Sequence, residues 1–156
     1  MPGTTLVRNV MTLNAMTLRP EQAITDAADI LAEHRFGGMP VVDGSGHLLG
    51  LLRDEDLIVS EARVHVPTFI TLLGATIPVP GTMHHLEEEL HKFAGATVED
   101  VMDKECPTIG PDDTLEDLAS MMWEHDVTHV PVIDNDRKVL GIVARGDLVR
   151  FIARTT

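Results

Sequence analysis

This 156-residue sequence is poor in cysteine and in basic residues, and each shortage excludes a class of protein. Cys106 is the only cysteine, so no disulfide can form within the chain, which is typical of proteins in the reducing cytoplasm. Only 12 Lys and Arg stand against 25 Asp and Glu, which gives a formal net charge of -13. Surfaces that bind nucleic acid need clustered basic residues. We therefore expect a cytoplasmic protein that does not bind nucleic acid.

The sequence also lacks the patterns of secretory and membrane-spanning segments. Its first residues have neither the charged stretch nor the apolar core of a secretory signal, so we expect none. The apolar stretch at residues 64–80 is shorter than a spanning helix and is interrupted by Pro67, Gly74, Pro78 and Pro80. We therefore expect no membrane partner.

No catalytic arrangement is visible in the sequence. Cys106 precedes a proline in an extended segment, with no helix start or positive cluster that would lower its pKa. The pattern contains no Gly-rich phosphate loop and no metal triad. His84, Glu88 and His91 share one face of a predicted helix, where an exposed polar surface explains them better than a metal site does. We expect neither an enzyme nor a resident metal or cofactor.

The most informative feature that is present is an internal repeat. When the chain is shifted by 91 residues it aligns with itself without a gap. The recurring positions include Val10-Met11 and Val101-Met102, Pro40-Val41 and Pro131-Val132, Leu49-Gly50 and Leu140-Gly141, and Asp56-Leu57 and Asp147-Leu148. Self-similarity at a fixed offset indicates one supersecondary unit used twice, with each copy too small to bury its own apolar face. We expect the function to lie where the two copies meet.

Each copy is predicted to fold as strand, helix, strand, strand, helix. The expected elements are an extended segment (16–18; 108–109), a helix (24–31; 115–122), two strands (39–42 and 48–52; 130–133 and 139–143) and a helix near the recurring Asp-Leu pair. We place Pro20 and Pro111 at the first position of the helices, where proline is favoured. The runs between the paired strands are turn sequences typical of antiparallel neighbours. The predicted fold class is mixed α/β (α+β).

The expected boundaries are a first repeat over residues 1–60, a connection over residues 61–96 and a second repeat over residues 97–156. The connection matches neither copy, and apolar residues at helical spacing predict a short helix over residues 84–93. A structureless loop of this length is unusual inside a compact domain. Residues 64–80 are therefore expected to cover the edge of the core or a subunit contact.

The order of elements, together with Gly50-Leu51-Leu52-Arg53-Asp54-Glu55-Asp56 and Gly141-Ile142-Val143-Ala144-Arg145-Gly146-Asp147, resembles a tandem pair of cystathionine-β-synthase (CBS) domains, a Bateman module. The resemblance implies two repeats packed with pseudo-two-fold symmetry and two clefts between them. In this family the clefts commonly bind adenosine-containing ligands such as AMP, ADP, ATP, NAD or S-adenosylmethionine. The modules usually form dimers and act as regulatory sensors. A homodimer that signals to an effector protein is therefore implied.

Two aspartates stand at the family's final motif position. By the resemblance, Asp56 and Asp147 accept hydrogen bonds from ribose hydroxyls, although capping of the nearby helix start explains them without a ligand. The family places Ser or Thr three residues before the aspartate, whereas this sequence has Arg53 and Ala144 there. We therefore expect two unequal clefts. Arg145 is the candidate phosphate ligand, and a solvated surface arginine is the alternative.

The other expected ligand contacts come from segments around the strand prolines and from the extended segments. They are Thr17, Leu18, Gly37, Gly38, Met39 and Pro40 in the first copy, and Thr108, Ile109, Thr128, His129, Val130 and Pro131 in the second. His129 lies inside this predicted wall, where its ring is suited to stacking on adenine. The alternative function is a nucleotide-free protein-interaction or dimerisation module in which Arg53 fills one cleft.

Overall fold

The computed structural model describes residues 4–57, 69–72, 75–78 and 95–155. Its elements are, in chain order, η2 (Val7–Asn9), β1 (Thr12–Leu13), α1 (Ile24–His34), β2 (Gly38–Val42), β3 (Leu48–Arg53), β4 (Phe69–Leu72), β5 (Ala75–Pro78), α4 (Val98–Val101), α5 (Leu115–Glu124), β6 (His129–Ile133), β7 (Val139–Ala144) and α6 (Arg145–Thr155). Residues 54–57, directly after β3, are also helical. The mixed α/β prediction is confirmed.

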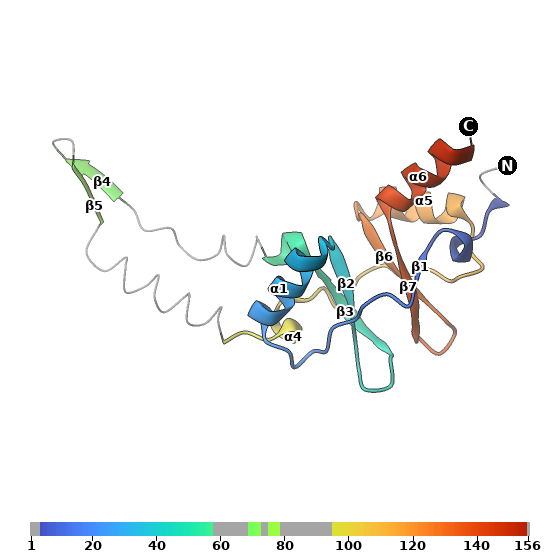
Figure 1. Ribbon diagram of the computed structural model, residues 1–156, viewed down its shortest axis with the longest axis horizontal. Coiled ribbons are helices and arrows are strands. Elements are labelled where there is room, and N and C mark those ends of the chain that lie inside the picture. The colour runs from blue at the N-terminus through green and yellow to red at the C-terminus, as the bar shows by residue number, and fades with distance from the viewer. Residues whose placement is uncertain (1–3, 58–68, 73–74, 79–94, 156) are drawn as a thin grey trace.

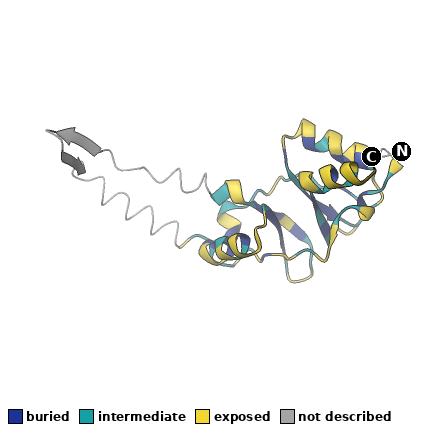
Figure 2. Ribbon diagram, turned by 45° about the horizontal axis from the view of Figure 1, so that its top comes forward, coloured by how far each residue is buried: buried dark blue, intermediate teal, exposed yellow. Residues whose placement is uncertain are grey.

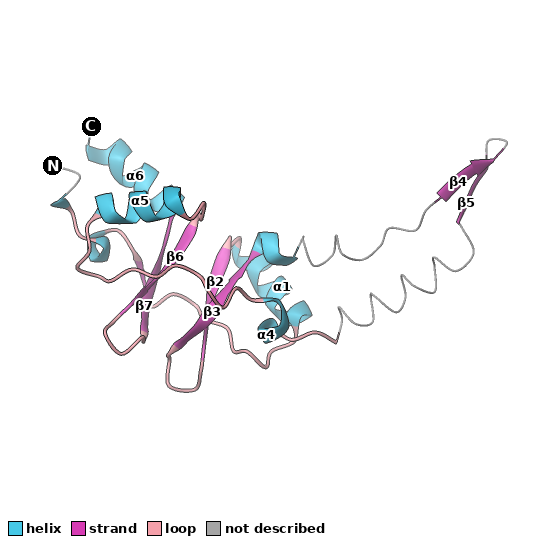
Figure 3. Ribbon diagram, turned by 180° about the vertical axis from the view of Figure 1, so that it is seen from behind, coloured by secondary structure: helices cyan, strands magenta, loops and turns pink. Residues whose placement is uncertain are grey.

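Each half of the molecule is built on an antiparallel hairpin. β2 pairs with β3 and β6 pairs with β7, and both hairpins have an irregularity at the same place, after Val41 and after Val132. A parallel bridge adds the preceding extended segment in each half, with Leu18 beside Val41 and Ile109 beside Val132. The two hairpins lie side by side (Figure 3). The four predicted hairpin strands agree with the observed ones to within one residue at each end, whereas the extended segments predicted as the first strand of each copy form only single bridges, at Leu18 and Ile109.

Helices α1 and α5 each turn one apolar stripe toward the hairpin of their own half. The buried residues are Ile24, Ala27 and Leu31 in α1, and Leu115, Leu118 and Met122 in α5. Their spacing of three and four residues places them on one face of a helix, as predicted. The strands form the buried interior and the helices are exposed on their outer faces (Figure 2).

The helix starts differ from the prediction, because Pro20 and Pro111 lie before the helices and not at their first position. Helix α5 begins after Thr114, whose hydroxyl accepts a hydrogen bond from the Asp117 N–H at 3.1 Å. The Asp117 carboxylate accepts in return from the Thr114 N–H, also at 3.1 Å. This capping box satisfies two N–H groups that a helix start otherwise leaves free. The cap residue, and not the proline, therefore decides where α5 begins.

The first residues of each copy pack into the other half of the molecule. Val7 is fully buried in the core of the second half, and Val98 is fully buried in the core of the first. The Val7 N–H donates to the Asp113 carbonyl and the Val98 N–H donates to the Gln22 carbonyl, both at 2.9 Å. The two hydrogen bonds are equivalent, because residues 7 and 22 of the first copy correspond to residues 98 and 113 of the second. In Figure 1 η2, which begins with Val7, accordingly lies beside the helices of the second half.

The glycine of the repeated Leu-Gly pair lies in both copies where another part of the backbone comes very close. β1 of the first copy pairs with β7 of the second. In the equivalent pairing, Asp103 of the second copy forms an antiparallel bridge with Leu51 of β3 in the first. A Cβ on Gly141 would lie 2.3 Å from the Thr12 carbonyl oxygen, and a Cβ on Gly50 would lie 2.7 Å from that of Asp103. Only glycine leaves room for such a close backbone approach. The exchange of segments therefore requires both glycines.

The connection between the halves contains an antiparallel hairpin of β4 and β5, which the sequence did not predict. Residues 84–93, where a helix was predicted, lie outside the described residues. No side chain of residues 64–80 is described, so the expectation that this segment covers core edge or a subunit contact stays a prediction. In the described part of the chain, no helix has the length and hydropathy needed to cross a membrane.

Candidate ligand-binding cleft

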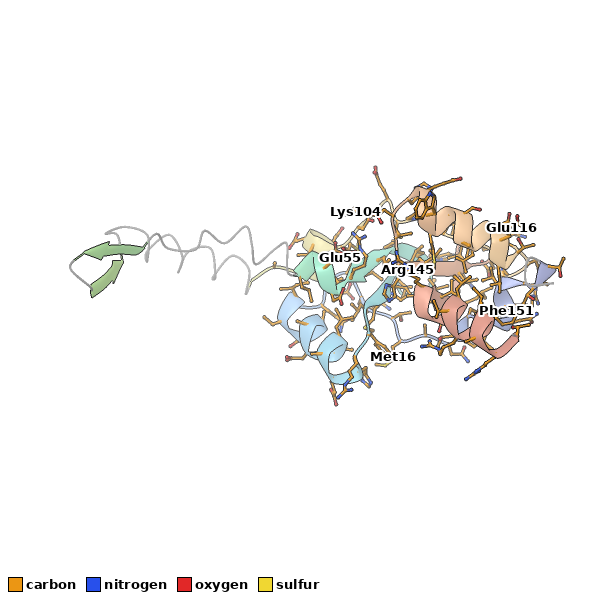
Figure 4. All side chains as sticks on the ribbon, turned by 90° about the horizontal axis from the view of Figure 1, so that it is seen from above. Met16, Glu55, Lys104, Glu116, Arg145 and Phe151 are labelled. Atoms are coloured by element: carbon orange, nitrogen blue, oxygen red, sulfur yellow. The ribbon has the colours of Figure 1, made fainter. Side chains whose placement is uncertain are left out.

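A cleft of about 360 Å³ opens between the two halves, a volume within the range of small-molecule sites. Its lining residues are Thr12, Asn14, Ala15, Met16, Arg35, Phe36, Gly37, Gly38, Met39, His129, Ile142, Ala144, Asp147 and Arg150. In Figure 4 Met16 marks the edge of the seam on this side, and Lys104 lies at the opposite edge. We call this site the Asp147 cleft.

The structure brings six of the predicted site residues together here. Gly37, Gly38 and Met39 come from the first copy, and His129, Ala144 and Asp147 come from the second. The cleft thus joins the aspartate of one copy to the strand of the other.

Other predicted residues lie outside the lining of the Asp147 cleft. The side chain of Arg145 lines a groove between α5 and α6 instead, next to Trp123, and its backbone N–H donates to the Thr128 carbonyl at 2.8 Å. Also outside this lining are the exposed Thr17, the buried Leu18, Pro40, Val130 and Pro131, and Thr108 and Ile109, which line a different depression. The phosphate role predicted for Arg145 is therefore not supported by its position.

Asp147 is held at the start of α6 by two contacts. Its Oδ2 accepts a hydrogen bond from the Ala144 N–H at 2.7 Å, and its Oδ1 pairs with the Arg150 guanidinium. The first contact is the capping role that the sequence allowed. A carboxylate offers about four acceptor positions. Acceptor capacity therefore remains on Asp147 for further donors in the cleft.

The corresponding aspartate of the first copy, Asp56, makes three hydrogen bonds with Arg53. The Arg53 Nη2 lies 2.9 Å from Oδ1, and Nε and the backbone N–H donate to Oδ2 at 3.2 and 3.0 Å. The guanidinium also reaches Glu55 at 3.1 Å and Asp103 at 3.9 Å. The bond to Asp56 raises the pKa of Arg53 above its usual value. Ala144 has only a methyl group at the matching position, so the two aspartates are in unequal surroundings.

His129 lies at the seam between the halves. A Cβ on Gly37 would lie only 2.5 Å from its Cε1, so the imidazole packs directly on the glycine backbone. Its Nδ1 is 2.9 Å from the Thr128 hydroxyl oxygen. Burial lowers the pKa of His129, and this effect outweighs the carboxylates of Asp54 and Asp147, which act in the opposite direction. The neutral imidazole is therefore the favoured form.

Several residues of the Asp147 cleft were not predicted. Among them, Arg35 ends α1 in the left-handed conformation with φ 53°, and Phe36 follows it. No sequence pattern marks these two as facing a cleft. Arg150 is different, because a residue three positions after Asp147 on one helix lies on the same face. That spacing was a usable signal for Arg150.

The structure offers no sign of a reactive thiol or of a metal site in the part of the chain that it describes. Burial raises the pKa of the Cys106 thiol to about 11, which disfavours the thiolate that a nucleophile needs. No group of three or more His, Cys, Asp or Glu with metal-binding geometry occurs among the described residues. His84, Glu88 and His91 lie outside them.

Comparison with known proteins agrees with this architecture. A profile of the CBS domain matches residues 7–62 and 98–154. The chain is 30% identical over 142 residues to the CBS domain-containing protein YhcV of Bacillus subtilis, covering 91% of this chain and 81% of that protein. It is 29% identical over 138 residues to the chloroplastic CBS domain-containing protein CBSX2 of Arabidopsis thaliana, covering 88% of this chain. The match spans only 58% of the length of the plant relative.

Solved structures share the same fold over nearly the whole chain. The crystal structure of CBSX2 in complex with AMP has a TM-score of 0.74 and 26% identity, covering 96% of this chain and 97% of that one. The CBS domain pair of protein MJ0100, in complex with 5′-methylthioadenosine and S-adenosyl-L-methionine, has a TM-score of 0.73 and 24% identity, covering 98% and 99%. The MJ0100 likeness supports the fold alone. With two profile matches and this fold, the chain belongs to the CBS domain family as a tandem CBS pair.

Proposed function

We propose that this chain is a regulatory module that binds an adenosine-containing nucleotide in the Asp147 cleft and passes its occupancy to a partner protein. The observation that carries the proposal is the cleft itself, which lies between the halves and is lined by Asp147 of one copy and by residues 35–39 of the other. The CBSX2 relative, which is 26% identical, was crystallised with AMP. Together these two observations favour an adenosine compound as the ligand.

In this proposal each part of a nucleoside has a partner in the cleft. Asp147 accepts hydrogen bonds from the ribose hydroxyls through its remaining acceptor positions. Phe36 provides an apolar surface for the base, and the neutral ring of His129, which packs on Gly37, is suited to stacking on it. Ala144 has no hydroxyl, so the ribose contact depends on the aspartate.

A ligand in this position contacts both copies, and this gives the module a means of signalling. Its affinity is higher for whichever relative orientation of the halves lets it contact both walls, so binding shifts the population toward that orientation. The proposed protein acts as a sensor and not as an enzyme, and it functions in the cytoplasm as a homodimer that contacts an effector chain. AMP, ADP, ATP, NAD and S-adenosylmethionine are the candidate ligands.

Isothermal titration calorimetry with these five compounds tests the proposal. We expect at least one of them to bind, and the absence of binding at millimolar ligand would contradict it. Asp147→Ala should weaken that binding by about tenfold or more, since a hydrogen bond to a charged group contributes about 1.5–3 kcal/mol. Circular dichroism should show an intact fold in the variant. Unchanged affinity would show that Asp147 does not contact the ligand.

One observation favours the alternative of a nucleotide-free interaction module. The groove between α5 and α6 is lined mostly by apolar side chains, with Asp126 and Arg145 as the charged ones, and its Trp123 is 88% exposed. Native mass spectrometry of freshly purified protein separates the two functions. Co-purified nucleotide supports the sensor, whereas a nucleotide-free oligomer supports the interaction module.

A further inference from the structure

We infer that the chain binds one phosphate-bearing nucleotide, in the Asp147 cleft only, and discriminates against adenosine compounds of positive charge. This inference rests on the proposed function and adds to it the charge of the ligand and the number of sites. The two copies differ in charge at matching positions of their sites.

The Asp147 cleft has an excess of positive charge. Two arginines, Arg35 and Arg150, line it, and Asp147 is its only carboxylate. One contact of Arg150 goes to Asp147, but a guanidinium has five N–H donors, so donors remain for an anion. Arginine pairs well with phosphate oxygens, and such charge-assisted hydrogen bonds are the stronger kind. A ligand that carries phosphate therefore gains more in this cleft than a neutral nucleoside does.

The corresponding site around Asp56, which we call the second site, is acidic at three of the matching positions. A shift of 91 residues takes Arg35 to Asp126, Thr12 to Asp103 and Asn14 to Glu105. One basic and two neutral residues are thus replaced by three acidic ones. The carboxylates would repel a phosphate bound at the second site. The Asp147 cleft has a cation or a neutral polar group at the same positions.

The second site is also filled by a side chain of the protein. Arg53 bonds to Asp56 at 2.9 Å and reaches Asp103 at 3.9 Å. These two carboxylates match Asp147 and Thr12, which both line the first cleft. The Arg53 guanidinium therefore lies between the residues that a ligand would have to separate. Its side chain is only 19% exposed, so removing it from this position would break mostly buried ion pairs.

The difference in charge does not come from a difference in backbone. Arg35, which caps the end of α1, has φ 53°, and Asp126, which follows the cap residue His125 of α5, has φ 51°, so both residues have the positive φ of the left-handed region. Aspartate tolerates this conformation better than most residues do. Arg35→Asp therefore copies into the first cleft what the second copy already accommodates.

Calorimetric titrations with AMP, adenosine and S-adenosylmethionine test the inference on the full chain. We expect one AMP per chain, adenosine at least about tenfold weaker, and S-adenosylmethionine weaker than adenosine. Arg35→Asp should lower the affinity for AMP by about tenfold or more, and should lower the affinity for adenosine by less. Arg19→Asp makes the same change in charge outside the cleft and should leave the affinity for AMP unchanged. Circular dichroism of both variants checks the fold.

Three results would overturn the inference while leaving the proposed function intact. They are two AMP molecules per chain, adenosine or S-adenosylmethionine bound as tightly as AMP, and an AMP affinity that does not change in Arg35→Asp. If none of the three compounds binds at millimolar concentration, the proposed function fails as well.

Discussion

At the scale of single residues, the side chain three positions before each aspartate decides what that aspartate can bind. Arg53 occupies both oxygens of Asp56, whereas Ala144 engages Asp147 only through its backbone N–H. The sequence already indicated that the two clefts are unequal. It left open whether Arg53 binds a phosphate or fills the cleft, because this depends on the distance to Asp103, a residue from the other copy.

His129 makes stability depend on pH. Because burial lowers its pKa in the folded protein, the unfolded chain binds more protons at this position. The full stability is present at pH values above the pKa of His129 in the unfolded chain, about 6.5. Stability is lost as the pH falls from there toward the lower pKa of His129 in the folded protein. His129→Asn should therefore reduce the loss of unfolding free energy between about pH 7.5 and about pH 5. Urea denaturation at both pH values measures this, and an identical pH dependence in wild type and variant would refute it.

At the scale of elements, the two copies of the first helix start differently. α5 has a capping box of Thr114 and Asp117, whereas α1 begins after Ala23, which makes no side-chain cap. Asp26 of α1 nevertheless takes the position that Asp117 has in α5. The first copy therefore lacks only the hydroxyl of the motif.

Exchanging these cap residues should change stability in opposite directions. Thr114→Ala removes the cap and should lower the free energy of unfolding by about 1 kcal/mol. Ala23→Thr supplies the missing hydroxyl to Asp26 and should raise the free energy of unfolding by a similar or smaller amount. Chemical denaturation of both variants provides the measurement. If Ala23→Thr destabilises the protein, the two helix starts are not equivalent.

The helices and strands also show which features of the fold a local sequence pattern can predict. The strands and the apolar stripes of α1 and α5 were predicted because alternation and helical spacing are properties of neighbouring residues. The positions of Pro20 and Pro111 were predicted wrongly, because cap side chains and contacts with the other copy set the helix starts. The hairpin of β4 and β5 was not predicted, because each of its strands has only four residues, which is at the lower limit for a recognisable alternating pattern.

At the scale of the whole molecule, neither half has a complete core of its own. Val7 is fully buried among second-half residues such as Leu118, and Val98 is fully buried among first-half residues such as Leu52. The halves are joined again at β1, which pairs with β7. Loss of one half therefore removes part of the core of the other.

This exchange predicts cooperative unfolding. Val7→Ala and Val98→Ala should each lower the free energy of unfolding by about 2 kcal/mol, as for a fully buried valine. Val149, which is 59% exposed, provides the control, and Val149→Ala should cost less than about 0.5 kcal/mol. Hydrogen exchange should show reduced protection in both hairpins for each core variant. Reduced protection in only one hairpin would show that the halves unfold independently.

The sequence by itself determined the repeat, the type of each main element and the expectation of two unequal clefts, because these follow from local periodicity and from comparison of one copy with the other. Only the tertiary structure decided which residues meet. Arg35 and Arg150 line one cleft although they lie in different copies, and Arg145 is placed in another groove. The physical reason is that the cleft forms across the seam, where segments distant in sequence are brought together by the burial of each copy against the other.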